Sequence, residues 1–168
     1  MADQAQAENP AKVLNDKIKD IRIAMLTTQE ADGKLISRPM GTQQIEFDGD
    51  LWFFTQASSP KVDQVQEHRQ VNVAYAKPDD NRYVSVSGTA VIVHDKQKMQ
   101  ELWNPILKAW FPKGLEDPEL ALLKVNVTGA EYWDTPSSKV VQLVGFAKAI
   151  VTGKPASNIG ENEKLDLS

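Results

Sequence analysis

Residues Ser37–Lys61 read S-R-P-M-G-T-Q-Q-I-E-F-D-G-D-L-W-F-F-T-Q-A-S-S-P-K. Two strand-like runs flank the D-G-D turn at residues 48–50, and the second run leads into a Ser/Pro/Lys loop. Pairing of the two runs as a hairpin would bring their polar groups to one place. These groups are Arg38, Gln43, Thr55, Ser58, Ser59 and Lys61. Two cations beside several hydroxyls suit a phosphate ligand.

The chain before this stretch predicts a helix and a strand. Apolar residues recur at helical spacing from Pro10 to about Asp20, with proline suited to the first turn. Arg22–Thr28 is typical of a strand, and the A-D-G turn at 31–33 joins it to a second strand that we expect to run to Phe47. That strand contains Pro39, which has no N–H to donate, so a bulge or a sheet edge is expected there.

The chain after this stretch alternates strands and helices. A helix is predicted over Pro60–His68, with Ser59 as its N-cap and its free N–H groups directed at the Ser/Lys loop. Further strands are predicted at Leu51–Thr55, Val71–Tyr75 and Arg82–His94. Gly88 predicts a bulge in the longest of these. Leu120–Thr128 and Ala130–Thr135 are also predicted as strand, either continuous through Gly129 or interrupted there. A helix that starts after Asp95 should break near Asn104, because Pro105 follows.

These elements predict a mainly β protein, with an antiparallel barrel or sandwich and flanking helices. We expect a flexible N-terminus over residues 1–9, one barrel domain over 10–151, and a flexible polar tail over 152–168. A length of 168 residues fits one such domain.

Composition narrows the classes of function. A net charge of −4 argues against non-specific nucleic-acid binding. The chain has no cysteine and two histidines, which argues against a disulfide framework and against a Cys- or His-rich metal site. No apolar run is long enough for a membrane span and no signal peptide is evident, so we expect a cytoplasmic protein that does not insert in membranes.

Several motifs together resemble a known family. They are S-R-P-M, F-D-G-D-L-W-F-F-T, S-S-P-K-V, V-N-V-A-Y, R-Y-V-S-V-S-G-T-A, E-L-W-N-P-I-L-K-A-W-F-P-K-G and A-E-Y-W-D. In this combination, over Ile18–Thr135, the chain resembles the general stress protein 26 branch of the pyridoxamine 5'-phosphate oxidase-like flavoproteins. The resemblance implies an FMN-binding split barrel of six to seven largely antiparallel strands, working as a homodimer with flavin at the interface.

The resemblance also implies a set of flavin-binding residues. The family's phosphate- and ribityl-binding positions match Arg38, Met40, Ser59 and Lys61, and the strand end beside the flavin matches Phe54 and Thr55. Pro39 and Ser58, which adjoin these positions, are also candidates for cofactor binding. Gln43 stands where the oxidase itself has a lysine, and Pro60 where it has an arginine. Trp110 and Trp133 are further candidates for flavin contact, although packing in the core or at an interface is the simpler explanation for aromatic residues at such positions.

Three functional hypotheses follow. The first is an FMN-dependent oxidoreductase, with FAD as the alternative flavin and NAD(P)H as a candidate reductant. The family's Arg-x-His substrate motif is absent, since neither residue occurs after Thr152, and this argues against pyridoxamine 5'-phosphate oxidation. The second is a protein that sequesters or senses flavin without turnover, because no residue stands out as a catalytic acid or base. The third is a deazaflavin- or haem-binding relative on the same barrel.

Overall fold

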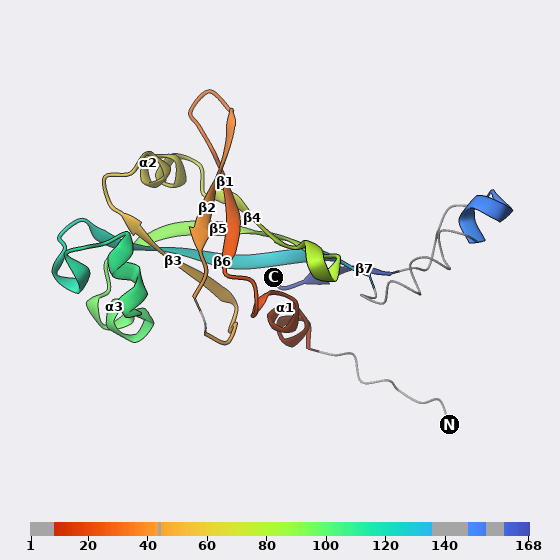
Figure 1. Cartoon of the computed structure of the whole chain (residues 1–168). Helices are drawn as coiled ribbons and strands as arrows, with labels where there is room; N and C mark the ends of the chain where they lie inside the picture. The colour runs from red at the N-terminus through yellow and green to blue at the C-terminus, as the bar shows by residue number, and fades with distance from the viewer. Residues whose placement is uncertain (1–8, 44, 136–147, 154–159) are drawn as a thin grey trace.

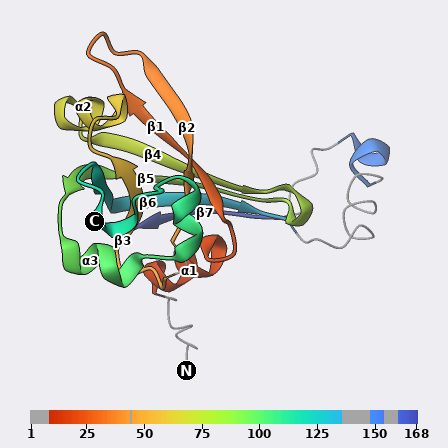
Figure 2. The same cartoon turned by 60° about the vertical axis from the view of Figure 1, so that its left-hand side comes forward.

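A single curled antiparallel sheet forms the body of the molecule. The computed structural model describes residues 9–43, 45–135, 148–153 and 160–168. Its seven strands run in the order β2-β1-β4-β5-β6-β3, and β7 also pairs with β6. The strands are β1 (Ile23–Gln29), β2 (Leu35–Gly41), β3 (Asp50–Gln56), β4 (Gln70–Lys77), β5 (Arg82–Val93), β6 (Leu120–Asp134) and β7 (Glu161–Asp166). The end strands β2 and β3 approach each other without pairing, so the sheet is a split barrel, as predicted (Figures 1 and 2).

Short helices cover the sheet at three places (Figure 1). They are α1 (Pro10–Ile18), α2 (Pro60–Glu67) and α3 (Lys96–Leu102), with 3₁₀ turns η1 (Pro78–Asp80), η2 (Pro105–Ala109) and η3 (Gly114–Glu116). Residues 148–152 are also helical. The break predicted before Pro105 is confirmed, because α3 ends at Leu102 and only a 3₁₀ turn continues it. Within the described residues, no helix combines the length and apolar character needed to cross a membrane.

The N-terminal helix follows from its first residues. The Asn9 side chain accepts a hydrogen bond from the Ala11 N–H at 3.0 Å, and Pro10 occupies the first turn. Leu14 and Ile18, four residues apart, fall on one face and are buried against the sheet.

The predicted hairpin between the runs at 37–47 and 51–55 is wrong. Among the described strands, β2 pairs with β1 alone, in a register that places Met25 opposite Pro39, and β3 pairs with β6. The strand also ends at Gly41 rather than Phe47, because β1 begins at Ile23 opposite Gly41 and offers no further partner strand. Pro39 therefore lies on an edge strand, one of the two places expected for it.

The two longest strands carry the predicted bulge. β5 and β6 pair along most of their length, and the register shifts between Ser87 and Gly88. A Cβ atom on Gly88 would lie 2.4 Å from the Asn126 carbonyl oxygen, so the close approach of the strands requires glycine.

Buried apolar residues form two clusters. The larger lies between α1, α2 and the inner face of the sheet and contains Leu14, Phe53 and Val86. The smaller packs α3 and the following loop against β3 and β6, through Phe54, Phe111 and other residues. Phe53 and Phe54 thus point to opposite sides of β3, as the alternation of a strand requires.

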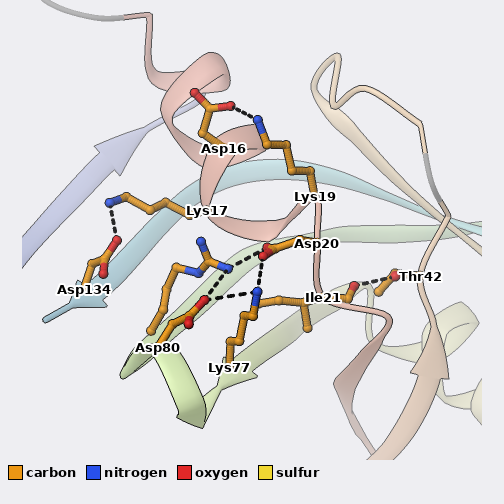
Figure 3. Close-up of polar contacts among 10 residues, drawn as sticks. Asp16, Lys17, Lys19, Asp20, Ile21, Thr42, Lys77, Asp80 and Asp134 are labelled. Carbon is orange, nitrogen blue, oxygen red and sulfur yellow. Dashed lines mark hydrogen bonds and ion pairs between the residues drawn. The ribbon is translucent and has the colours of Figure 1, made fainter. Parts of the chain in front are cut away.

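Ion pairs tie α1 and the chain just after it to the barrel (Figure 3). Lys17 contacts Asp134 of β6 at 2.6 Å. Asp20 accepts from both Lys77 and Arg82, the latter at 2.6 Å. Burial alone would raise the pKa of Asp20, but the hydrogen bonds from Lys77 and Arg82 outweigh it and lower the pKa to about 2.

The prediction of a flexible tail over 152–168 is wrong for residues 161–166. They form β7, which pairs with the second half of β6 from Gly129 to Asp134. Leu165 is the buried anchor of this strand, and Tyr132 donates a hydrogen bond to Glu163 at 2.8 Å. The polar composition of β7 hid it, because one apolar residue is enough for a short edge strand.

Candidate functional site

A cavity of about 450 Å³ lies where the split in the barrel brings β2 near the end of β3. One side is the β1–β2 edge, and the opposite side is the aromatic loop around η2. Its lining residues are Ile23, Pro39, Met40, Gly41, Gln43, Phe54, Thr55, Gln56, Lys61, Leu107, Trp110 and Phe111. The walls are therefore mostly apolar, with Lys61 as the one charged side chain among the described lining residues.

Arg38 lies beside the cavity and is held by neutral groups. Its Nη1 donates to the Thr28 hydroxyl at 2.5 Å, and its Nη2 donates to the Gln64 Oε1 at 2.9 Å. The Thr28 hydroxyl in turn donates to the same Gln64 oxygen at 2.6 Å. Three elements thus position one guanidinium: β2 carries it, while β1 and α2 hold it.

Lys61 and Ser59 form the neighbouring part of the site, at the start of α2. Lys61 Nζ donates to Ser59 Oγ at 3.0 Å, and Ser59 Oγ lies 3.4 Å from the Thr55 hydroxyl. Ser59 occupies the predicted N-cap position of α2, but its hydroxyl makes no capping hydrogen bond. The hydroxyl contacts Lys61 and Thr55 instead of the helix backbone.

The electrostatics of the site favour an anion. In the described part of the chain, neither Arg38 nor Lys61 forms an ion pair with a carboxylate. Burial lowers the pKa of Lys61, and the positive charge of nearby Arg38 lowers it further. Burial also lowers the pKa of Arg38, partly offset by Glu30. Two cations thus lie close together and are partly desolvated. A bound anion would offset both the repulsion between them and the cost of their desolvation.

Aromatic side chains form the wall opposite β2. Phe54 packs edge-on against Trp103 with ring centroids 5.6 Å apart, and at 6.2 Å from Phe111. This packing fixes the loop that carries Trp110. Trp110 lines the cavity yet is 62% exposed, so one side of the cavity is covered by little of this chain.

The structure brings most of the predicted site residues together. Pro39, Met40, Gln43, Phe54, Thr55, Lys61 and Trp110 line the cavity, and Arg38 and Ser59 adjoin it. These residues come together because β2 and β3 lie near each other across the split in the barrel, and not because the two strands form the predicted hairpin. Gln43 lies in the loop after β2 rather than on the strand.

The two remaining predicted site residues do not line the cavity. The Ser58 side chain is exposed, and its N–H donates to the Glu119 carboxylate at 3.1 Å. Trp133 pairs with Tyr83 near the far end of β6, whereas Leu120 at the start of β6 pairs with Gln56 beside the cavity. Trp133 therefore does not line the cavity of its own chain.

Sequence reasoning missed several residues of the site. Thr28 and Gln64 hold Arg38, and Ile23, Gly41 and Leu107 line the cavity. Gln64 had a usable signal, since it lies three residues after Lys61 and so shares a helix face with it. Thr28 had none, because its contact with Arg38 depends on the register of the β1–β2 pairing, which the turn alone does not give.

Comparisons with known proteins agree with this architecture. The family model described as "Pyridoxamine 5'-phosphate oxidase like" matches residues 9–157, and the chain belongs to this family. Protein bli-3 of Neurospora crassa is 32% identical over 161 residues, which cover 86% of this chain and 77% of that protein.

Solved structures of general stress proteins share the fold. A general stress protein 26 structure from Jannaschia sp. CCS1 superposes with a TM-score of 0.70 and 27% identity, covering 90% of this chain and 94% of that one. The general stress FMN/FAD binding protein of Xanthomonas citri gives a TM-score of 0.63 and 29% identity, over 74% of this chain and 87% of that one. The predicted family and split-barrel fold are thereby confirmed.

Proposed function

We propose that this chain binds FMN, with the phosphate at Arg38, Lys61 and Ser59 and the ring in the adjoining cavity. One observation carries the proposal: two partly buried cations lie beside a largely apolar cavity. Within the described residues, neither cation has a carboxylate partner. The family and the FMN/FAD binding protein of Xanthomonas citri support a flavin. FAD is the alternative, since the same cations would meet its phosphates.

A titration of flavins into the apoprotein tests this proposal. Wild-type protein should bind FMN more tightly than riboflavin, which has the same ring without the phosphate. Arg38→Ala and Lys61→Ala should each weaken FMN binding by roughly tenfold or more, the range of a charge-assisted hydrogen bond. Arg69→Ala and Lys96→Ala remove exposed cations elsewhere and should change nothing. Equal affinity of both alanine variants and wild type would show that the phosphate lies elsewhere.

We further propose flavin-dependent oxidoreduction, in which the flavin would supply hydride or electron transfer. The chain's own residues would orient and shield the ring: Thr55 and backbone N–H groups at the end of β3 offer hydrogen bonds, and Phe111 and Leu107 exclude water. Lys61 is the only charged lining residue among those described, so a reaction without a protein acid or base fits best. Pyridoxamine 5'-phosphate oxidation is not part of the proposal.

Non-catalytic binding or sensing of flavin is the second candidate, favoured by the same shortage of acid and base groups in the cavity. Anaerobic addition of NADH or NADPH to the flavin-loaded protein separates the two. Loss of the oxidised flavin absorbance supports the oxidoreductase. We also propose that the protein is cytoplasmic, where NADH and NADPH are available as reductants. A spectrum that neither nucleotide changes supports the binding role.

A homodimer is also part of the proposal. Met25, Ala74 and Ser85 are paired across β1, β4 and β5, and Ala76, Tyr83 and Trp133 continue the same outer face. Met25, Tyr83 and Trp133 are exposed there among small side chains, and Ile23 and Pro39 of this face line the cavity. A second copy packed on this face would cover the apolar side chains and close the open side of the cavity.

Sedimentation tests the dimer. Ala74→Arg places a charge in the middle of this face and should give a monomer that binds FMN more weakly. Gln97→Arg puts the same side chain on exposed α3 and should leave the dimer intact. A wild-type monomer that binds FMN tightly would refute a site shared between subunits.

A further inference from the structure

We infer that Gln64 and Thr28 are positioning residues that make the site selective for a phosphorylated flavin. They hold the Arg38 guanidinium without neutralising it. The inference rests on the proposed phosphate site at Arg38 and Lys61, and it concerns two residues that contact neither the cavity nor, in the proposal, the flavin itself.

The hydrogen bonds among these three side chains form a closed triangle. Arg38 donates to Thr28 Oγ1 at 2.5 Å and to Gln64 Oε1 at 2.9 Å, and Thr28 donates to Gln64 Oε1 at 2.6 Å. A guanidinium can only donate, so the Gln64 oxygen must face Arg38 and its NH₂ group must point away. Glu30 Oε1 lies 3.5 Å from that NH₂ group, which fits this orientation.

The triangle explains how an arginine on an edge strand keeps one orientation. β2 is an edge strand, where a long side chain has many accessible rotamers and loses entropy when a ligand fixes it. Thr28 is only 1% exposed, so its hydroxyl is a fixed acceptor. Because the triangle uses one N–H on each terminal nitrogen, the remaining N–H groups of Arg38 are still available to an anion.

The chemistry of the holding groups matters as much as their position. A carboxylate in place of Gln64 would also accept from Arg38, but it would cancel the charge that attracts phosphate. Glu30 contacts the Gln64 amide, and its charge raises the pKa of Arg38 against the larger effect of burial, which lowers it. A neutral amide therefore separates the arginine from the acid.

The test compares affinities for FMN and riboflavin in variants of equal size. Gln64→Glu keeps the acceptor and adds a charge, so it should weaken FMN binding by roughly tenfold while riboflavin binding changes less than about twofold. Gln64→Leu and Thr28→Val remove the holding groups and should weaken FMN binding by roughly three- to tenfold. Gln66→Glu adds the same charge to the exposed side of α2 and is the matched control.

Two further measurements separate positioning from a structural role. In the Arg38→Ala background, Gln64→Leu should have no further effect on FMN affinity, because there is no guanidinium left to hold. Thermal stabilisation by inorganic phosphate should be present in wild type and reduced in Gln64→Glu. An equal loss of FMN and riboflavin affinity would show a structural role and overturn the inference, as would unchanged FMN affinity in Gln64→Glu. Wild-type protein that binds neither flavin but responds to phosphate would refute the proposed function and the flavin selectivity, and would leave Gln64 and Thr28 as positioning residues of a phosphate site. No response to any of the three ligands would refute both the proposed function and the positioning role.

Discussion

Lys61 Nζ donates to Ser59 Oγ at 3.0 Å, a neutral partner for a half-buried cation. Burial and the nearby charge of Arg38 both lower the pKa of this lysine. Folding therefore disfavours the charged form of Lys61, which is the form that predominates at neutral pH in the unfolded chain. A residue kept at a cost to stability is typical of a binding site, where the ligand supplies the missing partner.

We therefore predict opposite effects of Lys61→Met on stability and on binding. A lysine whose folded pKa lies below its unfolded pKa costs stability at every pH at which the unfolded lysine is charged. Removal of the charge should raise the melting temperature of the apoprotein at neutral pH and weaken FMN binding by roughly ten- to a hundredfold. Lys96→Met on α3 is the control and should alter neither quantity. A lower melting temperature in apo Lys61→Met would contradict the argument.

Much of the fold was predictable from local patterns. Alternation gave β4, β5 and β6, and Gly88 gave the bulge between the latter two strands. Turn signals predicted partners only in part, however. The A-D-G turn correctly joined β1 to β2, but the D-G-D turn wrongly indicated that β3 pairs with β2, whereas β3 pairs with the distant β6. β7 was missed because its single buried residue, Leu165, produces no periodic pattern.

The candidate site was predictable to the extent that its residues lie in recognisable motifs. Arg38 and Lys61 were found on charge and on family resemblance, and the split in the barrel brings them together. Thr28 and Gln64 were not found, since an uncharged residue that orients another has no signature of its own in one sequence. Trp133 was chosen from sequence as an aromatic, but its place at the far end of β6 means that only a second copy would bring it to a cavity.

The pKa of Asp20 leads to a prediction about acid stability. Its folded pKa of about 2 lies below the ordinary value of 3.8, so the carboxylate stabilises the fold above pH 4 and loses this effect as the pH falls from about 4 towards 2. The side chain is 40% exposed, so solvent screening limits the contribution to about 1 kcal/mol. Urea unfolding should show Asp20→Asn less stable than wild type at pH 6, with the difference shrinking below pH 4.

A matched variant tests whether the Lys77 and Arg82 contacts cause that difference. Asp32→Asn removes an exposed carboxylate from the β1–β2 turn, at a position outside this ion-pair group. It should not reproduce a stability difference that disappears between pH 4 and pH 2. A constant difference between wild type and Asp20→Asn over the whole pH range would mean that ionisation is not the cause.

The bulge at Gly88 gives a prediction for stability. A Cβ atom there would lie 2.4 Å from the Asn126 carbonyl oxygen and 2.8 Å from Val125 Cγ1, and both belong to the strand that β5 must pair with. Gly88→Ala should therefore lower the free energy of unfolding by about 1–3 kcal/mol, the usual cost of overpacking. Gly41→Ala, where no atom lies within 4 Å of the added Cβ, should leave stability nearly unchanged. Equal stability of both variants would mean that β6 can move away at little cost.

The last prediction concerns the two exposed tryptophans. Trp110 lines the cavity but is 62% exposed, so Trp110→Ala should weaken FMN binding by roughly three- to tenfold, the range of an aromatic contact, with little loss of stability. Ile106→Ala, in the same turn but away from the cavity, is the control. Trp133→Ala distinguishes a site built from one chain from a site shared by two copies, because this side chain does not line the cavity of its own chain. FMN affinity is measured by quenching of flavin fluorescence. Unchanged affinity in Trp133→Ala supports a site built from one chain, with Trp110 as its aromatic wall. A loss comparable to that of Trp110→Ala requires that a second copy contributes Trp133 to the site.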